Sequence, residues 1–245
     1  MKRFLLWLYR RAPWRALNRW LGYSERRRLL DAALETQRTA MRGRVLEIGA
    51  GRAGRRGRFA PPVEDAEQWI TLDVNPQQSP HVVGDVLALP FPSGAFDTVL
   101  CLEVLEYVGD LLPALAEMRR MLEPSGVLIL SMPFLHRADT PSDTWRLTEN
   151  GLRRLLSEAG FTLEEVIPQG AALAVAANIL KYVVHLIRFR PLRIVCAALA
   201  WLPLMLLRWL DAPLAARQPI LKTYSTGYLL RARVDRGEDA HHAGL

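Results

Sequence analysis

The chain has 245 residues, of which half are hydrophobic and 23% are charged. This composition excludes a wholly disordered chain, and two cysteines, Cys101 and Cys196, exclude a disulfide-rich secreted scaffold and offer no metal-ligand spacing. The mean hydropathy of +0.04 is high for a purely soluble enzyme and low for a polytopic membrane protein. A pI near 9.9 suggests an anionic partner if the positive charge is concentrated in one place.

The charge is divided unevenly along the chain. Residues 1–30 carry a net charge of +8, residues 31–170 carry −7, residues 171–220 carry +5 and residues 221–245 carry +1. An acidic middle is therefore flanked by two cationic segments that are also rich in apolar residues.

Residues 1–30 form a basic amphipathic segment. In Met1–Gly22 the cations alternate with Trp, Leu and Phe, which is typical of a helix that lies in a membrane interface. Packing on the protein's own core and nucleic-acid binding are the alternatives, and we expect no nucleic acid. The apolar stretch Phe4–Tyr9 is too short for a secretory signal, so we expect a cytoplasmic protein.

The pattern of residues 25–170 predicts strands that alternate with helices. The expected helices are Glu25–Arg42, Val104–Leu122 and Thr148–Ala159. The expected strands are Arg44–Ile48, Trp69–Asp73, His81–Val86, Phe96–Leu102, Gly126–Met132, Phe161–Ile167 and, after an interruption, Thr223–Val234. We therefore predict an α/β fold with a doubly wound, Rossmann-like, seven-stranded sheet.

Residues 171–220 interrupt this alternation and form an apolar helical insertion before the last strand. The expected parts of the chain are the segment 1–30, a core over 31–170, the insertion 171–220, the last strand within 221–235 and a tail over 236–245. Neither insertion helix reaches the roughly 20 apolar residues that a membrane span needs, since Ile194–Leu207 gives only 14 without a charge. We expect a hairpin that lies in the interface or dips into one leaflet, with a buried lid or a dimer contact as the alternative.

A glycine turn follows the first expected strand. Gly49, Gly51 and Gly54 follow Val45–Ile48, and such a turn lets the backbone approach a ligand closely. Asp73 ends the next strand, where a carboxylate can accept both hydroxyls of a ribose. Both features also suit a dinucleotide-binding protein.

A third motif separates the two interpretations. Gly84-Asp85-x-x-x-Leu89-Pro90-Phe91 is followed by Phe96-Asp97-x-Val99, then Glu103-Val104-Leu105-Glu106 and Leu122-x-Pro124-x-Gly126. In order and spacing the sequence resembles the class I S-adenosylmethionine-dependent methyltransferases, in the group called methyltransferase type 11. The resemblance covers roughly residues 43–170 and the last strand, and it disfavours an NAD-dependent dehydrogenase.

The resemblance implies S-adenosyl-L-methionine as the cofactor, no metal, and a role for each matching residue. The loop around the methionine part of the cofactor would be Glu47, Gly49, Ala50 and Gly51. Asp73 would hold the ribose with Val74 beside the adenine, Asp85 and Val86 would hold the adenine, and Leu102 would lie under the cofactor. The chain departs from the family at Ala53, which replaces a third glycine, and at Tyr107, which replaces a frequent histidine.

A second local resemblance, to methyltransferases associated with polysaccharide or glycolipid biosynthesis, covers Met132–His136 and Pro141–Leu152. His136, Asp143 and Arg146 are the catalytic candidates in this segment. His136 is either a general base or an ordinary loop histidine, and Arg146 either binds an anionic acceptor group or forms a structural ion pair with Asp143.

The leading hypothesis is an S-adenosylmethionine-dependent methyltransferase that O-methylates a lipid-linked or glycan acceptor at the membrane surface. Peripheral membrane contact would use residues 1–22 and 171–210, on the inner face of the cytoplasmic membrane. The alternatives are a soluble small-molecule methyltransferase whose extra helices form a lid or a dimer interface, and a non-catalytic module with this fold.

Overall fold

The computed structural model describes residues 13–51 and 57–235, which fall into two compact units. The sheet unit contains Leu30–Gln169 and the chain from Gly227 onward, and the helical unit contains the chain up to Leu29 together with Gly170–Thr226. Three features of the sequence analysis lie outside the described residues. They are the first 12 residues of the predicted basic segment, the third glycine position at Ala53 with Gly54, and the tail 236–245.

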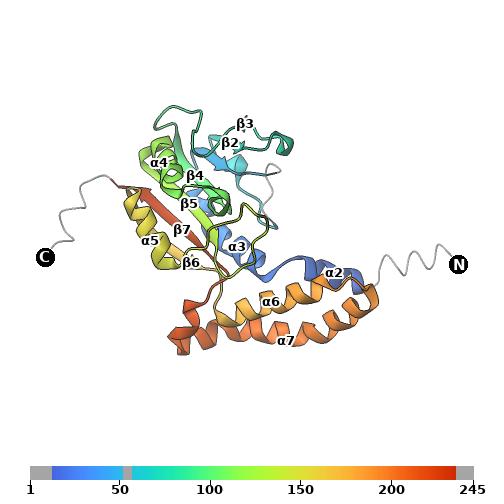
Figure 1. Ribbon diagram of the computed structural model, residues 1–245. Helices are drawn as coiled ribbons and strands as arrows, with labels where there is room; N and C mark the ends of the chain where they lie inside the picture. The colour runs from blue at the N-terminus through green and yellow to red at the C-terminus, as the bar shows by residue number, and fades with distance from the viewer. Residues whose placement is uncertain (1–12, 52–56, 236–245) are drawn as a thin grey trace. The chain divides into compact units, whose positions relative to one another are not determined.

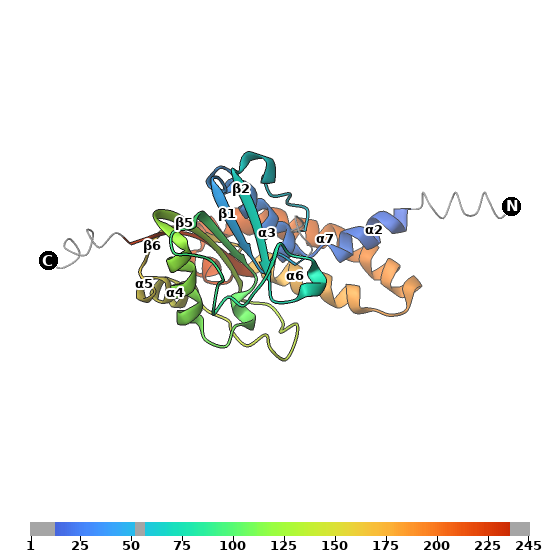
Figure 2. The same cartoon turned by 90° about the horizontal axis from the view of Figure 1, so that it is seen from above.

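The sheet unit is built on seven strands in the order β3-β2-β1-β4-β5-β7-β6 (Figures 1 and 2). Their bounds are β1 Arg44–Ile48, β2 Gln68–Asp73, β3 Val82–Val83, β4 Phe96–Leu102, β5 Leu122–Pro133, β6 Phe161–Pro168 and β7 Gly227–Val234. The pairs from β3 through β5 are parallel, and β7 runs antiparallel to both β5 and β6. The chain order reverses direction between β1 and β4, so ligands are expected at the carboxyl ends of these strands. The predicted seven-stranded Rossmann-like fold is confirmed.

Helices cover both faces of the sheet. On one face the later part of α3 (Glu25–Thr36) places Leu30 and Leu34 on the strand residues Val45 and Leu100, all of them buried. On the other face α4 (Leu111–Met121) and α5 (Glu149–Glu158) bury a second apolar cluster that is built around Leu46 and Val99. The central strands β1, β4 and β5 are therefore buried on both sides over most of their length, which explains the continuous apolar runs in the sequence.

Short 3-10 segments lie in the connections of both units. They are Arg38–Ala40, Val63–Asp65, Pro76–Gln78, Leu105–Tyr107 and Pro219–Thr223. The last of these occupies part of the predicted final strand, so β7 begins at Gly227 rather than at Thr223.

The predicted helix Val104–Leu122 is wrong in its first third. Leu105–Tyr107 forms a 3-10 turn, and α4 begins only at Leu111. Main-chain carbonyls in this stretch accept hydrogen bonds from a distant loop: Thr144 N donates to Glu106 O (2.8 Å), and Trp145 Nε1 donates to Val108 O (2.8 Å). These tertiary bonds replace helical ones, so the local helix propensity is overridden.

The helical unit contains α2 (Pro13–Gly22), α6 (Ala172–Leu186) and α7 (Arg190–Arg217), and α6 and α7 lie side by side as a hairpin (Figures 1 and 2). Several of its internal contacts are polar, beside buried apolar residues such as Val175 and Leu204. Asp211 of α7 accepts hydrogen bonds from the main-chain N–H groups of Ala171 and Ala174 (2.8 and 2.9 Å), which satisfies the amino end of α6. Lys181 Nζ donates to Tyr23 O (2.7 Å) and lies 4.5 Å from the centroid of the Trp20 ring.

Helix α7 is longer than the sequence analysis predicted. It continues through Pro203 and Pro213 over 28 residues, because buried residues seven apart, Ala197, Leu204 and Asp211, lie on both sides of Pro203. Within the described ranges it is the one helix whose length and apolar composition would allow it to cross a membrane, and 11% of its most apolar window is buried.

Candidate active site

The carboxyl end of β1 turns sharply at two glycines. Gly49 has a φ of +64° and Gly51 has a φ of +59°, which residues other than glycine rarely adopt. The N–H groups of Gly49 and Ala50 both donate to Leu72 O (2.8 and 3.3 Å), which ties the turn to β2. A Cβ atom at Gly49 would lie 2.3 Å from Val104 Cγ2, whereas one at Gly51 would meet nothing within 4 Å. The turn is therefore closed toward β4 at Gly49 and open at Gly51.

Asp73, at the carboxyl end of β2, is held against this turn. Its Oδ2 accepts from Gly51 N–H (3.0 Å) and its Oδ1 accepts from Asn75 N–H (2.8 Å). A carboxylate has about four acceptor positions, so two main-chain donors fix its orientation and leave capacity for two hydroxyl groups. The structure thus brings Asp73 and the glycine turn into direct contact.

Asp85 lies beside Asp73 in the fold. Val83 is the register partner of Asp73, and Gly84 N–H donates to Asp73 O (3.2 Å), which places Asp85 directly after the carboxyl end of β3. The Asp85 side chain is exposed, and its Oδ1 accepts from Leu87 N–H (3.0 Å). Val86 is buried in the core, and the Val74 side chain is 69% exposed.

Glu47, Ala50 and Leu102 are the most enclosed of the predicted cofactor residues, each 1% exposed. Glu47 Oε2 accepts from Trp69 Nε1 (3.0 Å), which fixes its carboxylate within the sheet face under α3. The Leu102 side chain packs in the same apolar cluster. Its main chain, at the end of β4, is therefore the part of Leu102 that can reach a ligand.

Glu103 was given no role by the sequence analysis, but it has an unusual backbone. Its φ is +59°, one of two positive values at non-glycine residues in the described chain. Its N–H donates to Ser131 O (3.1 Å), and its Oε1 accepts from Ser131 Oγ (3.1 Å). Such strain persists only where surrounding contacts impose it, and it concentrates at functional sites. The sequence feature that could have indicated a functional role for Glu103 is its position as an acidic residue directly after a buried strand at the switch point.

The loop between β5 and α5 contains two ion pairs, Arg137–Asp139 (2.8 Å) and Arg146–Asp143, and the second of them makes most of the loop's contacts. Arg146 binds Asp143 through both terminal nitrogens, with Nη2 at 2.7 Å from Oδ2, and donates to the main-chain carbonyls of His136 (3.4 Å), Arg137 (3.0 Å) and Trp145 (2.6 Å). These five acceptors match the five N–H groups of a guanidinium. The hydrogen bond from Arg146 lowers the pKa of Asp143, whose side chain is 2% exposed. The geometry supports a structural clamp for this pair.

His136 lies three residues beyond the carboxyl end of β5, the neighbour of β4, and its side chain is partly exposed. It shares this edge of the sheet with the glycine turn and Glu103. Burial raises the pKa of Tyr107, so this phenol keeps its proton at neutral pH and cannot act as a base. His136 is the candidate base that the sequence analysis named in this loop.

Comparisons with known proteins agree with this geometry. Residues 46–130 match the family model described as a methyltransferase domain. The probable S-adenosylmethionine-dependent methyltransferase of Mycolicibacterium smegmatis is 34% identical over 150 residues, which are 53% of this chain and 57% of that protein. Residues 46–130 are therefore similar to a methyltransferase domain, and the chain is similar to S-adenosylmethionine-dependent methyltransferases.

Two further comparisons show how much of this chain and of its relatives is matched. An uncharacterized 37.1 kDa protein in a transposon of Streptomyces fradiae is 28% identical over 51% of this chain and 45% of its own length. The chain thus spans about half the length of the curated relatives it matches. The crystal structure of the [4+2]-cyclase SpnF matches with a TM-score of 0.55 and 20% identity over 83% of this chain and 79% of that one, which shows the shared fold alone.

The residues of the methyltransferase domain fit S-adenosylmethionine. The open side of Gly51 lets a ligand approach the main chain closely, and the oriented carboxylate of Asp73 supplies the acceptors that a ribose diol needs. Asp85 adds an exposed acceptor on the next strand, where an adenine amino group could donate.

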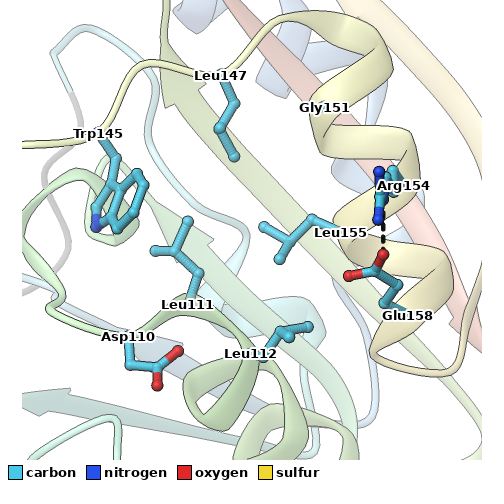
Figure 3. A pocket seen from close by; sticks show the side chains of 9 residues that line it. All are labelled: Asp110, Leu111, Leu112, Trp145, Leu147, Gly151, Arg154, Leu155 and Glu158. Carbon is cyan, nitrogen blue, oxygen red and sulfur yellow. Dashed lines mark hydrogen bonds and ion pairs between the residues drawn. The ribbon is translucent and has the colours of Figure 1, made fainter.

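A pocket of about 290 Å³ lies on the α4–α5 side of the methyltransferase domain (Figure 3). Leu111, Trp145, Leu147 and Leu155 form its apolar wall, and the ion pair of Arg154 with Glu158 lies at one end. This volume is at the lower limit of ligand pockets, so it has room for a small apolar group.

Proposed function

We propose that the protein is an S-adenosylmethionine-dependent methyltransferase that O-methylates a lipid-linked or glycan acceptor at a membrane surface. The clasp between Asp73 and the N–H of Gly51 at the switch point of the sheet supports a nucleoside-binding site, and the match of residues 46–130 to a methyltransferase domain carries the reaction type. The family match and the M. smegmatis relative support the same reaction.

Each chain residue has a defined task in this proposal. Gly49, Ala50 and Gly51 bind the methionine part of the cofactor through the main chain, with Glu47 holding the turn from within the sheet. Asp73 accepts from the ribose hydroxyls beside Val74, and Asp85 and Val86 receive the adenine. The bound cofactor supplies an electrophilic methyl group on a sulfonium that is already a good leaving group.

The remaining tasks concern the acceptor. Positioning its oxygen in line with the methyl group provides most of the rate, because the leaving group needs no activation. A sugar hydroxyl is poorly ionised, so His136 takes its proton. Asp143 and Arg146 keep the loop that carries His136 in one conformation.

The acceptor class is inferred from the apolar surface of the helical unit and its cationic composition, +5 over residues 171–220. Lipid-linked acceptors are delivered at a membrane, and anionic lipids of the cytoplasmic leaflet attract arginine. The inner face of the cytoplasmic membrane is therefore the proposed location.

Cofactor binding provides the first test. Calorimetry with S-adenosylmethionine should show binding by the native chain and at least a tenfold weaker affinity for Asp73→Ala and for Asp85→Ala. Leu87→Ala is the control, because its main-chain N–H is retained. Unchanged affinity in both aspartate variants would refute the assigned roles.

Acceptor identity provides the second test. The chain is incubated with methyl-labelled cofactor and either a lipid extract or an aqueous extract of the source cells. Label that enters the organic phase and gives an O-methyl signal in ¹³C NMR supports the proposal, and the His136→Ala variant should bind cofactor normally while transferring little label. Label found in water-soluble products alone would favour a soluble small-molecule methyltransferase instead.

A further inference from the structure

The helical unit exposes many large apolar side chains and buries four charged or polar ones. Glu25, Asn178, Lys181 and Asp211 are each at most 8% exposed, and their partners lie within the same unit. They are buried beside apolar residues such as Val175 and Leu204. The large apolar side chains that are at least half exposed are Ile179, Leu180, Val183, Leu186, Phe189, Leu192, Val195, Leu199, Leu202, Leu206, Trp209 and Ile220. An exposed apolar surface of this extent marks a binding site rather than an ordinary solvent-facing surface.

The exposed residues of α7 form a regular row, which we name the outer row. It consists of Leu192, Val195, Leu199, Leu202, Leu206 and Trp209, with spacings that alternate between three and four residues along one face of the helix. Residues 194–207 contain no charged side chain. A helix that is apolar on its buried and exposed faces alike fits hydrocarbon better than water.

Cations mark the limits of this apolar surface. Arg188 and Arg190 flank Phe189 in the turn of the hairpin, Arg193 follows within the first turn of α7, and Arg208 lies near the other end of the row. Arginines at the ends of an apolar face suit anionic headgroups. Two copies of this cationic segment would repel each other, and the outer row lacks the flanking charges of opposite sign that guide helix pairing.

The connectivity decides how the hairpin can lie in a bilayer. Gln169 N–H donates to Gly227 O (2.8 Å), so the chain leaves and re-enters the sheet at one point. If α7 crossed the membrane, α6 would have to cross as well. The 15 residues of α6 extend only about 22 Å, less than the roughly 30 Å hydrocarbon core, and Lys181 lies among them.

We propose that α6 and α7 lie in the plane of an anionic membrane, with the outer row in the hydrocarbon boundary and Arg188, Arg190, Arg193 and Arg208 at the headgroups. This inference rests on the proposed function, because membrane binding would bring the protein to a lipid-linked acceptor. It makes the protein a monotopic membrane protein that does not span the bilayer.

Vesicle binding by the full chain tests the lipid contact. The Leu199→Gln/Leu206→Gln variant should lose at least tenfold in partition to vesicles of phosphatidylcholine with 30% phosphatidylglycerol, prepared at about 0.1 M salt. The matched control is Val63→Gln/Leu112→Gln, which replaces two side chains of the sheet unit that are about 40% exposed, and it should bind as the native chain does. S-adenosylmethionine affinity is measured in each variant to show that the fold persists.

Depth measurements test the orientation. Nitroxide labels are attached at Leu192→Cys, Leu199→Cys and Leu206→Cys, one at a time, in a chain carrying Cys196→Ser. Equal shallow depths at the three positions support the in-plane arrangement. A maximum at position 199, with the others about 10 Å shallower, would mean that α7 crosses the bilayer and would overturn it.

Two further outcomes separate the inference from the proposed function. Vesicle binding without methyl transfer to any extract refutes the function and leaves the anchor in place. A native chain that ignores vesicles and sediments as a dimer, and that becomes a monomer in Leu199→Gln/Leu206→Gln, would show that a second copy covers the outer row and would overturn the inference.

Discussion

The contrast between Gly49 and Gly51 gives a sharp prediction about the cofactor turn. Both residues have positive φ, so alanine at either position adds a backbone strain of about 1–2 kcal/mol. Only at Gly49 does the new Cβ meet a side chain, since Val104 Cγ2 would lie 2.3 Å away. Overpacking of this kind costs a further ~1–3 kcal/mol. We therefore expect Gly49→Ala to lose about 2–5 kcal/mol of unfolding free energy and Gly51→Ala about 1–2 kcal/mol.

The assay is urea unfolding of the cofactor-free protein, followed by circular dichroism, with the midpoint and slope both fitted. The double variant Gly49→Ala/Val104→Ala removes the clashing atom, so it should be more stable than the sum of the two single effects predicts. Equal losses for Gly49→Ala and Gly51→Ala, or strict additivity in the double variant, would contradict the close packing of the turn on Val104.

Three other predictions concern charges. Asp73→Asn should weaken S-adenosylmethionine binding about 10- to 100-fold by calorimetry and also lower the unfolding midpoint, because the amide has one acceptor oxygen for the two main-chain N–H groups that bind the carboxylate. Because Arg146 depresses the pKa of Asp143, the pair stabilises the fold above the ordinary carboxyl pKa and this stability is lost as the pH falls below about 4. Arg146→Met should remove that part of the pH dependence of the thermal midpoint, and an unchanged acid profile would refute the clamp. Asp211→Ala should cost about 1–3 kcal/mol by urea unfolding, whereas the control Asp110→Ala, which makes no side-chain cap bond, should cost little.

The sheet and the cofactor clasp were predictable from sequence because they depend on local patterns. Each parallel strand is a short apolar run, and the glycines and Asp73 follow such runs directly. The break before α4 was missed because it depends on hydrogen bonds from Thr144 and Trp145, more than 30 residues away. Sequence alone also gave no reason to expect the positive φ of Glu103.

Helix α7 shows a second limit of prediction from sequence. Proline inside a helix normally breaks or kinks it, yet α7 continues through both Pro203 and Pro213. The observed helix continues because its buried side chains repeat on both sides of Pro203. The sequence also does not reveal that Lys181 and Asp211 face inward, since composition counts charges but does not assign them to a face.

The hydrogen bond between Gln169 and Gly227 has a consequence for engineering. Pro168 and Tyr228 are register partners on antiparallel strands, so Gln169 and Gly227 could form a tight two-residue reverse turn if residues 170–226 were removed. The intervening 170–226 segment is then a cassette. Removing it would give a shorter protein for assays in solution. Inserting it into an equivalent hairpin of another protein would test whether the segment alone confers membrane binding.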